Sequence, residues 1–596
     1  MLKLLKKFTA VEWGLSILAF ALILVQVWLT LTMPDYMSEI TMLVQTEGSR
    51  MSEILTAGGM MLLCALGSLL ASAATVICAA RISSNFSANL RGDLFDRVQS
   101  FSMEEIGGFS TASLITRSTN DVMQVQMLIV LGLEVLLKAP VMAVWAILKI
   151  SGKNWQWTMS TAVAVVVLLC IVGVCMVFAL PKFKKMQVLT DNINRVTREN
   201  LTGLQVIRAY NAESYQEKKF EKANDDLKRT QLFANRVMCF MSPGIQMVMS
   251  GLTLAVYWIG AYLIQSAAGA EKMTLFSEMI VFSQYAMQVV MSFMMLVMIF
   301  ILLPRASVAA KRINEVLETE PTIEDGTFEG DAAKDSDDRA AVMASHEGEV
   351  EFRHVSFRYP DAEHPVLEDI SFTAKKGETV AFIGATGCGK STVINLIPRF
   401  YDVTEGEVLV DGVNVKEYRQ EALRNKIGYV SQKAILFSGT VSTNVAYGEN
   451  GKEEFTEEQI KEAVRTAQAE EFVAKLEDGY DGYIAQAGSN LSGGQKQRLS
   501  IARAVCRDPE IFIFDDSFSA LDYKTDRILR KTLEEECGGA TRLIVAQRIG
   551  TIRDADQIIV LEEGRIAGKG THDQLMKDCE VYRQIAFSQL SKEELA

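Results

Sequence analysis

Nine consecutive residues between positions 384 and 392 have the types and spacing suited to holding phosphate groups. They are Gly384, Ala385, Thr386, Gly387, Cys388, Gly389, Lys390, Ser391 and Thr392. An apolar run over 379–383 predicts a strand before them, and 393–397 predicts the start of a helix after them. The glycines allow backbone N–H groups to turn toward phosphate oxygens, and the helix N-terminus adds its positive end. Lys390 is expected to reach the β- and γ-phosphates and Ser391 to bind Mg²⁺. The pattern predicts a nucleoside triphosphate site.

Three other places in the same half of the chain carry candidate nucleotide contacts. Asp515 ends the apolar run 511–515, where it is expected to hold Mg²⁺ opposite Ser391. Tyr359 precedes the phosphate-loop strand and is a candidate to stack on adenine. A second predicted phosphate-binding helix start consists of Leu491, Ser492, Gly493, Gly494 and Gln495. If the two helix starts lie on different faces, one domain cannot present both to one nucleotide. Two domains that face each other can.

Composition excludes several broad classes of protein. The chain has 596 residues, 49% of them hydrophobic, and a mean hydropathy of +0.15, which is high for a soluble protein. Its net charge of −13 argues against nucleic-acid binding through phosphate contacts. The nine cysteines lack the spacing of a metal site or a disulfide framework. The first apolar run is too long for a cleavable signal peptide and is predicted to be a membrane helix.

Six apolar stretches in the first half are each long enough to cross a bilayer. They cover about 11–32, 54–80, 125–149, 157–180, 240–265 and 274–303. A loop is expected from Pro34 to Ser52, and the long connections 81–123 and 181–238 are expected to be helical extensions of the spans. Basic residues at the N-terminus and in 181–238 predict that both termini lie in the cytoplasm. Six buried helices of a soluble protein would need unusually long apolar runs.

The rest of the chain changes character abruptly. Acidic residues dominate 318–349, which is expected to be a solvated linker between a membrane domain at 1–317 and a second domain at 350–596. From Val350 onward, apolar strands alternate with helices, as in an α/β nucleotide-binding domain. The predicted fold class is therefore a multidomain membrane protein, with six all-α membrane helices followed by an α/β P-loop ATPase domain.

With these motifs in place, the chain resembles an ABC exporter half-transporter over nearly its whole length. The residues that carry the resemblance are the Walker A motif 384–392, the Q-loop Gln432, the signature 491–495, the Walker B motif 511–515, the D-loop ending at Asp522 and the segment 204–210. The resemblance implies ATP and Mg²⁺ as cofactors, with Gln432 among the Mg²⁺ contacts. It also implies that two nucleotide domains sandwich two ATP molecules, each held by the Walker motifs of one domain and the signature of the other.

Two positions depart from the family pattern at the residues that act on the γ-phosphate. Asp516 stands where the family has a glutamate that polarises water, and Gln547 stands where it has a switch histidine. Gln486 also replaces a usual glutamate just before the signature. Aspartate is one methylene shorter, so its carboxylate is poorly placed as a general base. The pattern resembles the degenerate-site subunit of heterodimeric multidrug or lipid exporters, whose partner carries the missing glutamate and histidine.

Evidence on the transported substrate is thin. Glu134 and Lys138 lie four residues apart in the third span, where ionisable groups mark candidate substrate contacts, but the pair could equally neutralise itself. We expect efflux of hydrophobic or amphipathic molecules, or of lipids, across a bacterial plasma membrane. The alternatives are a slow homodimeric exporter, an ATP-gated channel or regulatory subunit, and an NTPase that the spans merely anchor.

Overall fold

The computed structural model describes residues 2–46, 48–151, 153–267, 271–330, 343–360, 362–451 and 454–589. The chain divides into two compact units. The helical unit contains the chain up to Gln99 together with Thr111–Thr319, and the sheet unit contains Ser100–Ser110 together with the chain from Glu320 onward. The short segment Ser100–Ser110 therefore belongs to a unit whose remainder begins more than two hundred residues later.

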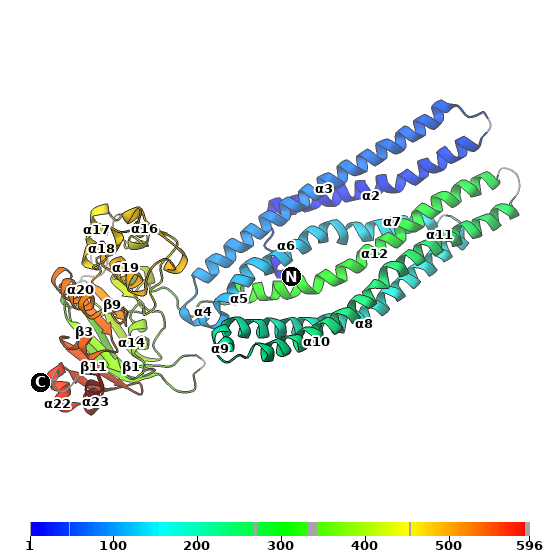
Figure 1. Ribbon diagram of the computed structural model, residues 1–596. Helices are drawn as coiled ribbons and strands as arrows, with labels where there is room; N and C mark the ends of the chain where they lie inside the picture. The colour runs from blue at the N-terminus through cyan, green and yellow to red at the C-terminus, as the bar shows by residue number, and fades with distance from the viewer. Residues whose placement is uncertain are drawn as a thin grey trace. The chain divides into compact units, whose positions relative to one another are not determined.

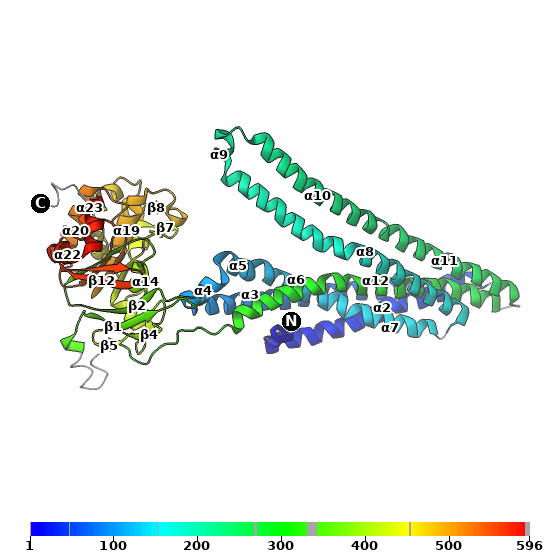
Figure 2. The same cartoon turned by 90° about the horizontal axis from the view of Figure 1, so that it is seen from below.

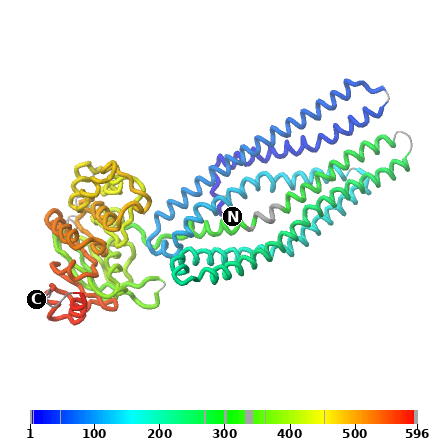
Figure 3. Tube along the Cα trace, in the orientation of Figure 1, coloured from blue at the N-terminus to red at the C-terminus, as the bar shows by residue number. Residues whose placement is uncertain are grey.

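Six helical segments of the helical unit are long and apolar enough to span a membrane, which confirms the six-helix prediction (Figures 1 and 3). The first, second, fourth and sixth segments are α2 (Ala10–Gln45), α3 (Met51–Gln99), α8 (Trp155–Thr202) and α12 (Glu271–Glu318). The third is built from α5 (Thr111–Thr116), η1 (Arg117–Asp121), α6 (Val122–Leu131), η2 (Gly132–Leu136) and α7 (Lys138–Ser151). The fifth joins α10 (Glu213–Cys239) to α11 (Met241–Ser266), and α1 (Leu2–Leu5) and α9 (Leu204–Ala209) are short.

The burial pattern of these helices is the one expected in lipid. Large apolar side chains remain exposed along them, among them Leu70, Val177 and Trp258. Inside the unit, Trp157 is fully buried and donates its indole N–H to the Val256 carbonyl at 3.1 Å. An apolar outer surface is unfavourable in water but stable against hydrocarbon. A helix can lie in hydrocarbon because its backbone hydrogen bonds are made internally.

The connection expected after the first span is shorter than the sequence predicted. Helix α2 continues through Pro34 to Gln45, so the loop predicted from Pro34 is wrong over that stretch. Contacts with α12 hold these extra turns in place: the Tyr285 hydroxyl donates to Asp35 at 2.6 Å, and the hydroxyls of Ser38 and Ser277 lie 2.6 Å apart. By contrast, the helical character predicted for the two long connections is confirmed by α3–α5 and by α8–α10.

The sheet unit contains a six-stranded sheet, a four-stranded sheet and a two-stranded ribbon. The six-stranded sheet comprises β3 (Thr379–Gly384), β6 (Ile427–Val430), β9 (Ile511–Asp515), β10 (Thr541–Val545), β11 (Gln557–Glu562) and β12 (Arg565–Gly570). The four-stranded antiparallel sheet comprises β1 (Val350–Phe357), β2 (Leu367–Ala374), β4 (Glu405–Val410) and β5 (Val413–Asn414), and the ribbon pairs β7 (Gly439–Thr440) with β8 (Tyr483–Ile484).

Ten α-helices accompany these strands in the described part of the unit after position 389, and the α4 helix joins them from the early segment. Their bounds are α4 (Met103–Phe109), α14 (Lys390–Leu396), α15 (Gln420–Asn425), α16 (Val441–Val445), α17 (Glu457–Thr466), α18 (Glu470–Val473), α19 (Gly493–Cys506), α20 (Tyr523–Glu536), α21 (Ile549–Ile552), α22 (His572–Asp578) and α23 (Glu580–Gln589). In Figure 2 the antiparallel strands β1, β2, β4 and β5 gather on one side of the unit, away from α19 and α20.

The order of the six-stranded sheet brings the predicted site together. The order is β12-β11-β3-β10-β9-β6, and all neighbours except β11 and β12 pair in parallel. The carboxyl ends of β3, β9 and β10 therefore meet at one edge, which is where open parallel sheets bind their ligands. The chain leaves these ends as the phosphate loop, as Asp516 and as Ala546-Gln547.

Part of the acidic segment is not a solvated linker, contrary to expectation. Ile323 and Phe328 are buried in the sheet unit, and the Phe328 backbone N–H donates to the Glu417 carbonyl at 2.9 Å. The Arg399 guanidinium, itself buried, donates to the Glu324 carbonyl at 2.9 Å. Ile323 and Phe328 are apolar residues within an otherwise acidic segment, and their burial holds 320–330 against the unit. The residues 331–342 of the predicted linker lie outside the described residues.

Helix α4 is fixed to the same docked segment. The Glu105 carboxylate accepts hydrogen bonds from the backbone N–H groups of Thr322 at 2.9 Å and of Ser102 at 2.7 Å. Burial raises the pKa of Glu105, but the bonds from Ser102 and Thr322 outweigh it and leave that pKa below its usual value. Glu105 therefore joins α4 to the stretch of chain that begins the main part of the sheet unit.

Candidate functional site

The phosphate loop joins β3 to α14 with the geometry that its sequence predicted. Gly389 caps α14 with φ at 99°, and a Cβ there would lie 2.6 Å from Leu367 Cδ2. Only glycine fits this conformation and this space. The Lys390 ammonium donates to the carbonyls of Gly384 and Ala385, at 2.8 Å each. Lys390 therefore lies across the loop that is expected to surround the phosphates.

Ser391 and Asp515 meet as predicted. The Ser391 hydroxyl donates to the Asp515 carboxylate at 2.9 Å, which joins the start of α14 to the end of β9. Burial raises the pKa of Asp515, as does the neighbouring charge of Asp516, while the hydrogen bond from Ser391 opposes the rise. A hydroxyl and one carboxylate, completed by phosphate oxygens and water, are the donor set that Mg²⁺ prefers. These two residues fit the metal.

Asp516 lies at the centre of a second cluster. Its Oδ2 accepts hydrogen bonds from the side-chain amides of Gln547 at 2.9 Å and Gln432 at 3.3 Å. Burial raises the pKa of Asp516, although Gln432, Ser519 and the charges of Lys390 and Arg548 oppose the rise. The structure thus brings together Asp516 and Gln547, the two departures expected to affect the γ-phosphate. It places Gln432 against Asp516, and within the described residues no hydrogen bond joins Gln432 to Ser391 or Asp515.

Tyr359 lies beside the phosphate helix. Its hydroxyl is 3.2 Å from the Thr392 hydroxyl, and its ring packs edge-on against Phe357 and Tyr401. The structure therefore places this candidate adenine contact beside Thr392, the last residue of the Walker A motif. It is half-buried, and the aromatic neighbours fix its orientation.

The signature forms a separate surface. Ser492 caps α19: its hydroxyl accepts from the Gln495 N–H, and the Gln495 side chain accepts from the Ser492 N–H at 2.8 Å. A Cβ on Gly494 would lie 3.3 Å from the carbonyl of Ala520 in the D-loop, and Asp522 caps α20. Within the described part of the chain, no hydrogen bond links 491–495 to 384–392. The two phosphate-binding helix starts open different helices, α14 and α19.

Family models match both halves of the chain. The model described as ABC transporter transmembrane region matches residues 16–293, and the model described as ABC transporter matches 367–519. The uncharacterized ABC transporter ATP-binding protein Rv1273c of Mycobacterium tuberculosis (strain H37Rv) is 40% identical over 531 residues, covering 89% of this chain and 87% of the relative. The chain belongs to the ABC transporter family, as an exporter half-transporter with fused membrane and ATPase domains.

Further relatives and a solved structure agree with this assignment. YfiB of Bacillus subtilis, an uncharacterized ABC transporter ATP-binding protein, is 37% identical over 86% of both chains. The ATP-dependent lipid A-core flippase of Pseudomonas fluorescens is 32% identical over 85% of this chain and 81% of its own. The structure of a bacterial Atm1-family ABC exporter with ATP bound has a TM-score of 0.78 and 23% identity, covering 98% of this chain and 99% of its own. That likeness shows the exporter fold.

The candidate substrate residues of this half-transporter lie at an irregular turn. Glu134 is part of the π-helical turn η2, which ends at Leu136, and Lys138 begins α7 two residues later. Both side chains are half-buried. π-Helical turns inside longer helices frequently mark functional positions. The charge of Glu134 nevertheless acts on Lys138, so a pair that neutralises itself stays an alternative to a substrate contact.

One residue of the site escaped the sequence analysis. Gln589, at the end of α23, bonds to the backbone on both sides of Arg548, so it contacts the loop that carries Gln547. A glutamine in a polar C-terminal helix has no motif and no distinctive spacing. No signal in the sequence distinguishes it from Gln584 on the same helix.

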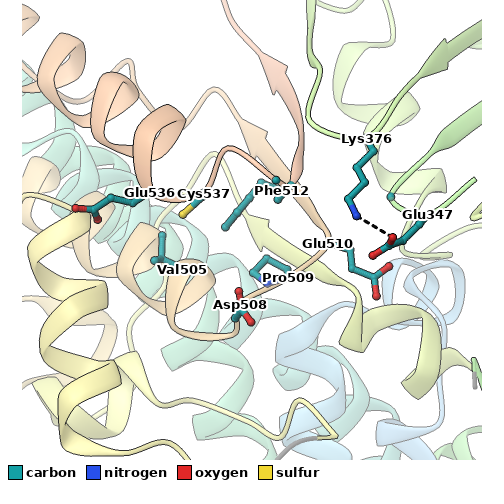
Figure 4. Close-up of a pocket in the computed structure, with 12 residues that line it drawn as sticks. Glu347, Lys376, Val505, Asp508, Pro509, Glu510, Phe512, Glu536 and Cys537 are labelled. Carbon is teal, nitrogen blue, oxygen red and sulfur yellow. Dashed lines mark ion pairs between the residues drawn. The ribbon is translucent and has the colours of Figure 1, made fainter. Parts of the chain in front are cut away.

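A second hollow of the ATPase domain, of about 350 Å³, lies at the opposite ends of the same strands (Figure 4). Its lining includes Glu510 and Ala540, which immediately precede β9 and β10, and an ion pair of 2.8 Å between Lys376 and Glu347. Burial raises the pKa of its one thiol, Cys537, to about 11, which keeps that thiol protonated and unreactive. Because ATP-site residues follow the carboxyl ends of these strands, this hollow is no part of that site.

Proposed function

We propose that this half-transporter works in a heterodimeric exporter, in which its own Walker motifs bind ATP and Mg²⁺ but hydrolyse ATP slowly. Its signature completes the competent site of a partner that carries a glutamate after the Walker B aspartate and a switch histidine. ATP binding draws the two ATPase domains together, and hydrolysis at the partner's site separates them again. The membrane helices convert this cycle into outward transport.

The observation that carries the proposal is the environment of Asp516. A general base must offer a free carboxylate oxygen to the attacking water. Asp516 Oδ2 already accepts from the amides of Gln547 and Gln432, so this oxygen is engaged by the protein rather than free for water, although burial keeps the pKa of Asp516 above its usual value. A histidine could lose or gain a proton near pH 7, whereas the Gln547 amide cannot. Both changes weaken proton transfer and leave the phosphate-binding loop intact.

The signature side supports a productive partner. Ser492 and Gln495 keep the complete capping box, and Gly493 and Gly494 leave the start of α19 open for phosphate oxygens. A subunit that used nucleotide only as a structural ligand would have no need of this surface. The intact signature therefore favours a hydrolytic cycle on the complex over the alternative of an ATP-gated channel or regulatory subunit.

The substrate class we favour is an amphipathic molecule or lipid. The relative named as a lipid A-core flippase spans 85% of this chain, which supports movement of a lipid-like substrate. Lys138, half-buried and without an ion-pair partner among the described residues, offers a cation inside a predicted membrane span. We propose that it contacts an anionic group of the substrate with Glu134 nearby, in a plasma membrane with the termini and ATPase domain on the cytoplasmic side.

The first test is the ATPase activity of the purified chain, alone and together with a candidate partner that has the consensus glutamate and histidine. A nearly inactive chain and an active pair would support the heterodimer. Rapid hydrolysis by the chain alone would overturn it in favour of a homodimeric exporter. ATP-dependent uptake into inverted vesicles, compared with passive flux on ATP binding, separates a pump from a gated channel.

The second test changes the site itself. In Asp516→Glu, the added methylene moves the carboxylate toward the attacking water. We expect ATPase activity of the pair to rise about threefold to tenfold, a small part of the gain that a well-placed general base provides. The matched control is Asp508→Glu, the same change at an exposed position near the second hollow. An unchanged rate in Asp516→Glu would contradict the geometric argument.

A further inference from the structure

The last helix of the chain ends against the loop that carries Gln547. The side-chain amide of Gln589 donates to the Gln547 carbonyl at 2.8 Å and accepts from the Ile549 N–H at 2.9 Å. One side chain thus pairs with two backbone groups that flank Arg548, as a neighbouring strand would. This double contact fixes both the position and the direction of the loop.

The loop depends on such support from outside. Ile549 begins α21, which has four residues, and Arg548 at its N-cap makes no side-chain capping bond. The first N–H groups of a helix have no partners within the helix and need acceptors elsewhere. Gln589 supplies the acceptor for Ile549, while the buried side chains of Ile549 and Ile552 hold α21 against the domain.

The same loop leads directly to the terminal-phosphate end of the ATP site. The Gln547 amide donates to Asp516 at 2.9 Å, and Asp516 follows Asp515, which is bonded to Ser391. The charge of Lys390 is close enough to lower the pKa of Asp516. Lys390 and Ser391 are the residues that meet the outer phosphates and Mg²⁺ in a phosphate loop. The Gln547 amide is therefore a further hydrogen-bond donor beside the residues expected to meet the terminal phosphate, where ATP and ADP differ.

We propose that Gln589 is a positioning residue, which holds Gln547 so that its amide donates to the terminal phosphate of ATP. The contact then sets the preference of this site for ATP over ADP. The inference rests on the proposed function, in which this site retains ATP rather than hydrolysing it quickly. Without Gln589 the loop is free to move, and ATP must order it when the terminal phosphate binds Gln547. This cost weakens ATP binding. ADP lacks the terminal phosphate, so its binding does not change.

The experiment measures ATP and ADP binding to the full-length chain in lipid nanodiscs with Mg²⁺, by displacement of a fluorescent ATP analogue. We expect Gln589→Leu to weaken ATP binding about threefold to tenfold, in line with partial loss of one hydrogen bond to a charged group, and to change ADP binding less than twofold. Gln589→Asn keeps the amide but shortens its reach, and it is expected to have the same effect. It replaces the leucine variant if that variant folds poorly.

The matched control is Gln584→Leu on the same helix. The Gln584 amide donates to Glu580 of its own helix at 3.4 Å, so its loss is expected to leave both affinities unchanged. Gln547→Ala is expected to reproduce the effect of Gln589→Leu, and the double variant to be no weaker than either single variant, because both remove one contact.

Three results would overturn the inference. They are equal weakening of ATP and ADP, a Gln589 variant that behaves like Gln584→Leu, and losses from Gln547→Ala and Gln589→Leu that add. A wild-type chain that binds ATP and ADP equally would also overturn it. Failure of the proposed function appears separately, as rapid phosphate release from ATP by the chain alone, and this is measured before the binding titrations.

Discussion

The ATPase domain presents two surfaces to nucleotide, and they differ in how far they follow the family pattern. The Walker surface, formed by 384–392 with Asp515, Asp516 and Gln547, keeps every phosphate-holding group but departs at both groups that act on the γ-phosphate. The signature surface, 491–495, has no departure. In the function we propose, the first surface keeps what ATP binding needs and lacks what hydrolysis needs, whereas the second keeps what hydrolysis at a partner's site needs.

The difference separates two kinds of physical requirement. ATP binding depends on backbone N–H groups, the charge of a lysine and a hydroxyl. These groups still attract phosphate when they are displaced slightly. Proton transfer depends on the placement of one oxygen atom within hydrogen-bond distance, and a single methylene decides it. Asp516 and Gln547 contact each other directly at 2.9 Å, so both changes fall in one small cluster.

The largest effect that would test this comparison is expected from Lys390→Ala. Removing the ammonium is expected to weaken ATP binding to the chain alone about tenfold to a hundredfold, since hydrogen bonds between charged groups contribute roughly 1.5–3 kcal/mol. Lys569→Ala, at an exposed position on β12, is the control. If titration with a fluorescent ATP analogue gave equal affinities for the two variants, the Walker surface would not be the ATP site.

A smaller effect, on the other surface, is expected from Ser492→Arg. The long cation at the start of α19 opposes the helix dipole and fills the space for phosphate oxygens. We expect ATPase activity of the assembled pair to fall about tenfold, while ATP binding to the chain alone changes less than twofold. Loss of ATP binding by the chain alone would show that the two surfaces are not independent.

The smallest effect concerns the helix cap alone. Ser492→Ala removes the acceptor for the Gln495 N–H and is expected to cost about 1 kcal/mol of local stability. Ser492→Thr keeps an acceptor and is expected to retain the wild-type melting temperature, measured by differential scanning calorimetry. If the alanine variant melts like wild type but loses ATPase activity in the pair, the serine hydroxyl contacts nucleotide rather than capping the helix.

Much of the architecture and of the phosphate-holding part of the site could be predicted from sequence. The strand–loop–helix pattern around Lys390 is typical of a phosphate loop. Apolar runs long enough to span a bilayer are typical of membrane helices. The contact between Ser391 and Asp515 followed, because parallel strands bring their carboxyl ends to one edge. The sequence also showed that Asp516 and Gln547 both replace residues expected to act on the γ-phosphate.

The parts that could not be predicted depend on contacts between distant polar residues. Pro34 was expected to end a helix, but Asp35 and Ser38 are held by α12, more than two hundred residues away. The acidic composition of 318–349 predicted a solvated linker, but Phe328 in this segment is buried. The burial of its side chain holds the segment against the unit despite the polar neighbours. Gln589 contacts the Gln547 loop across 42 residues with a side chain that carries no periodic signal.

The membership of α4 in the sheet unit also bears on how the protein is made. The hydroxyls of Ser102 and Thr322 lie 3.2 Å apart in the folded chain but 220 residues apart in the sequence. At roughly 5–20 residues per second, a ribosome needs on the order of 10–40 seconds to pass from one to the other. During that time α4 has no docking surface, and Phe101 and Phe109, which stack on each other, have little else to cover them. An ATPase fragment begun at Glu320 would lack α4 altogether, so its exposed docking segment would be a ready site for aggregation.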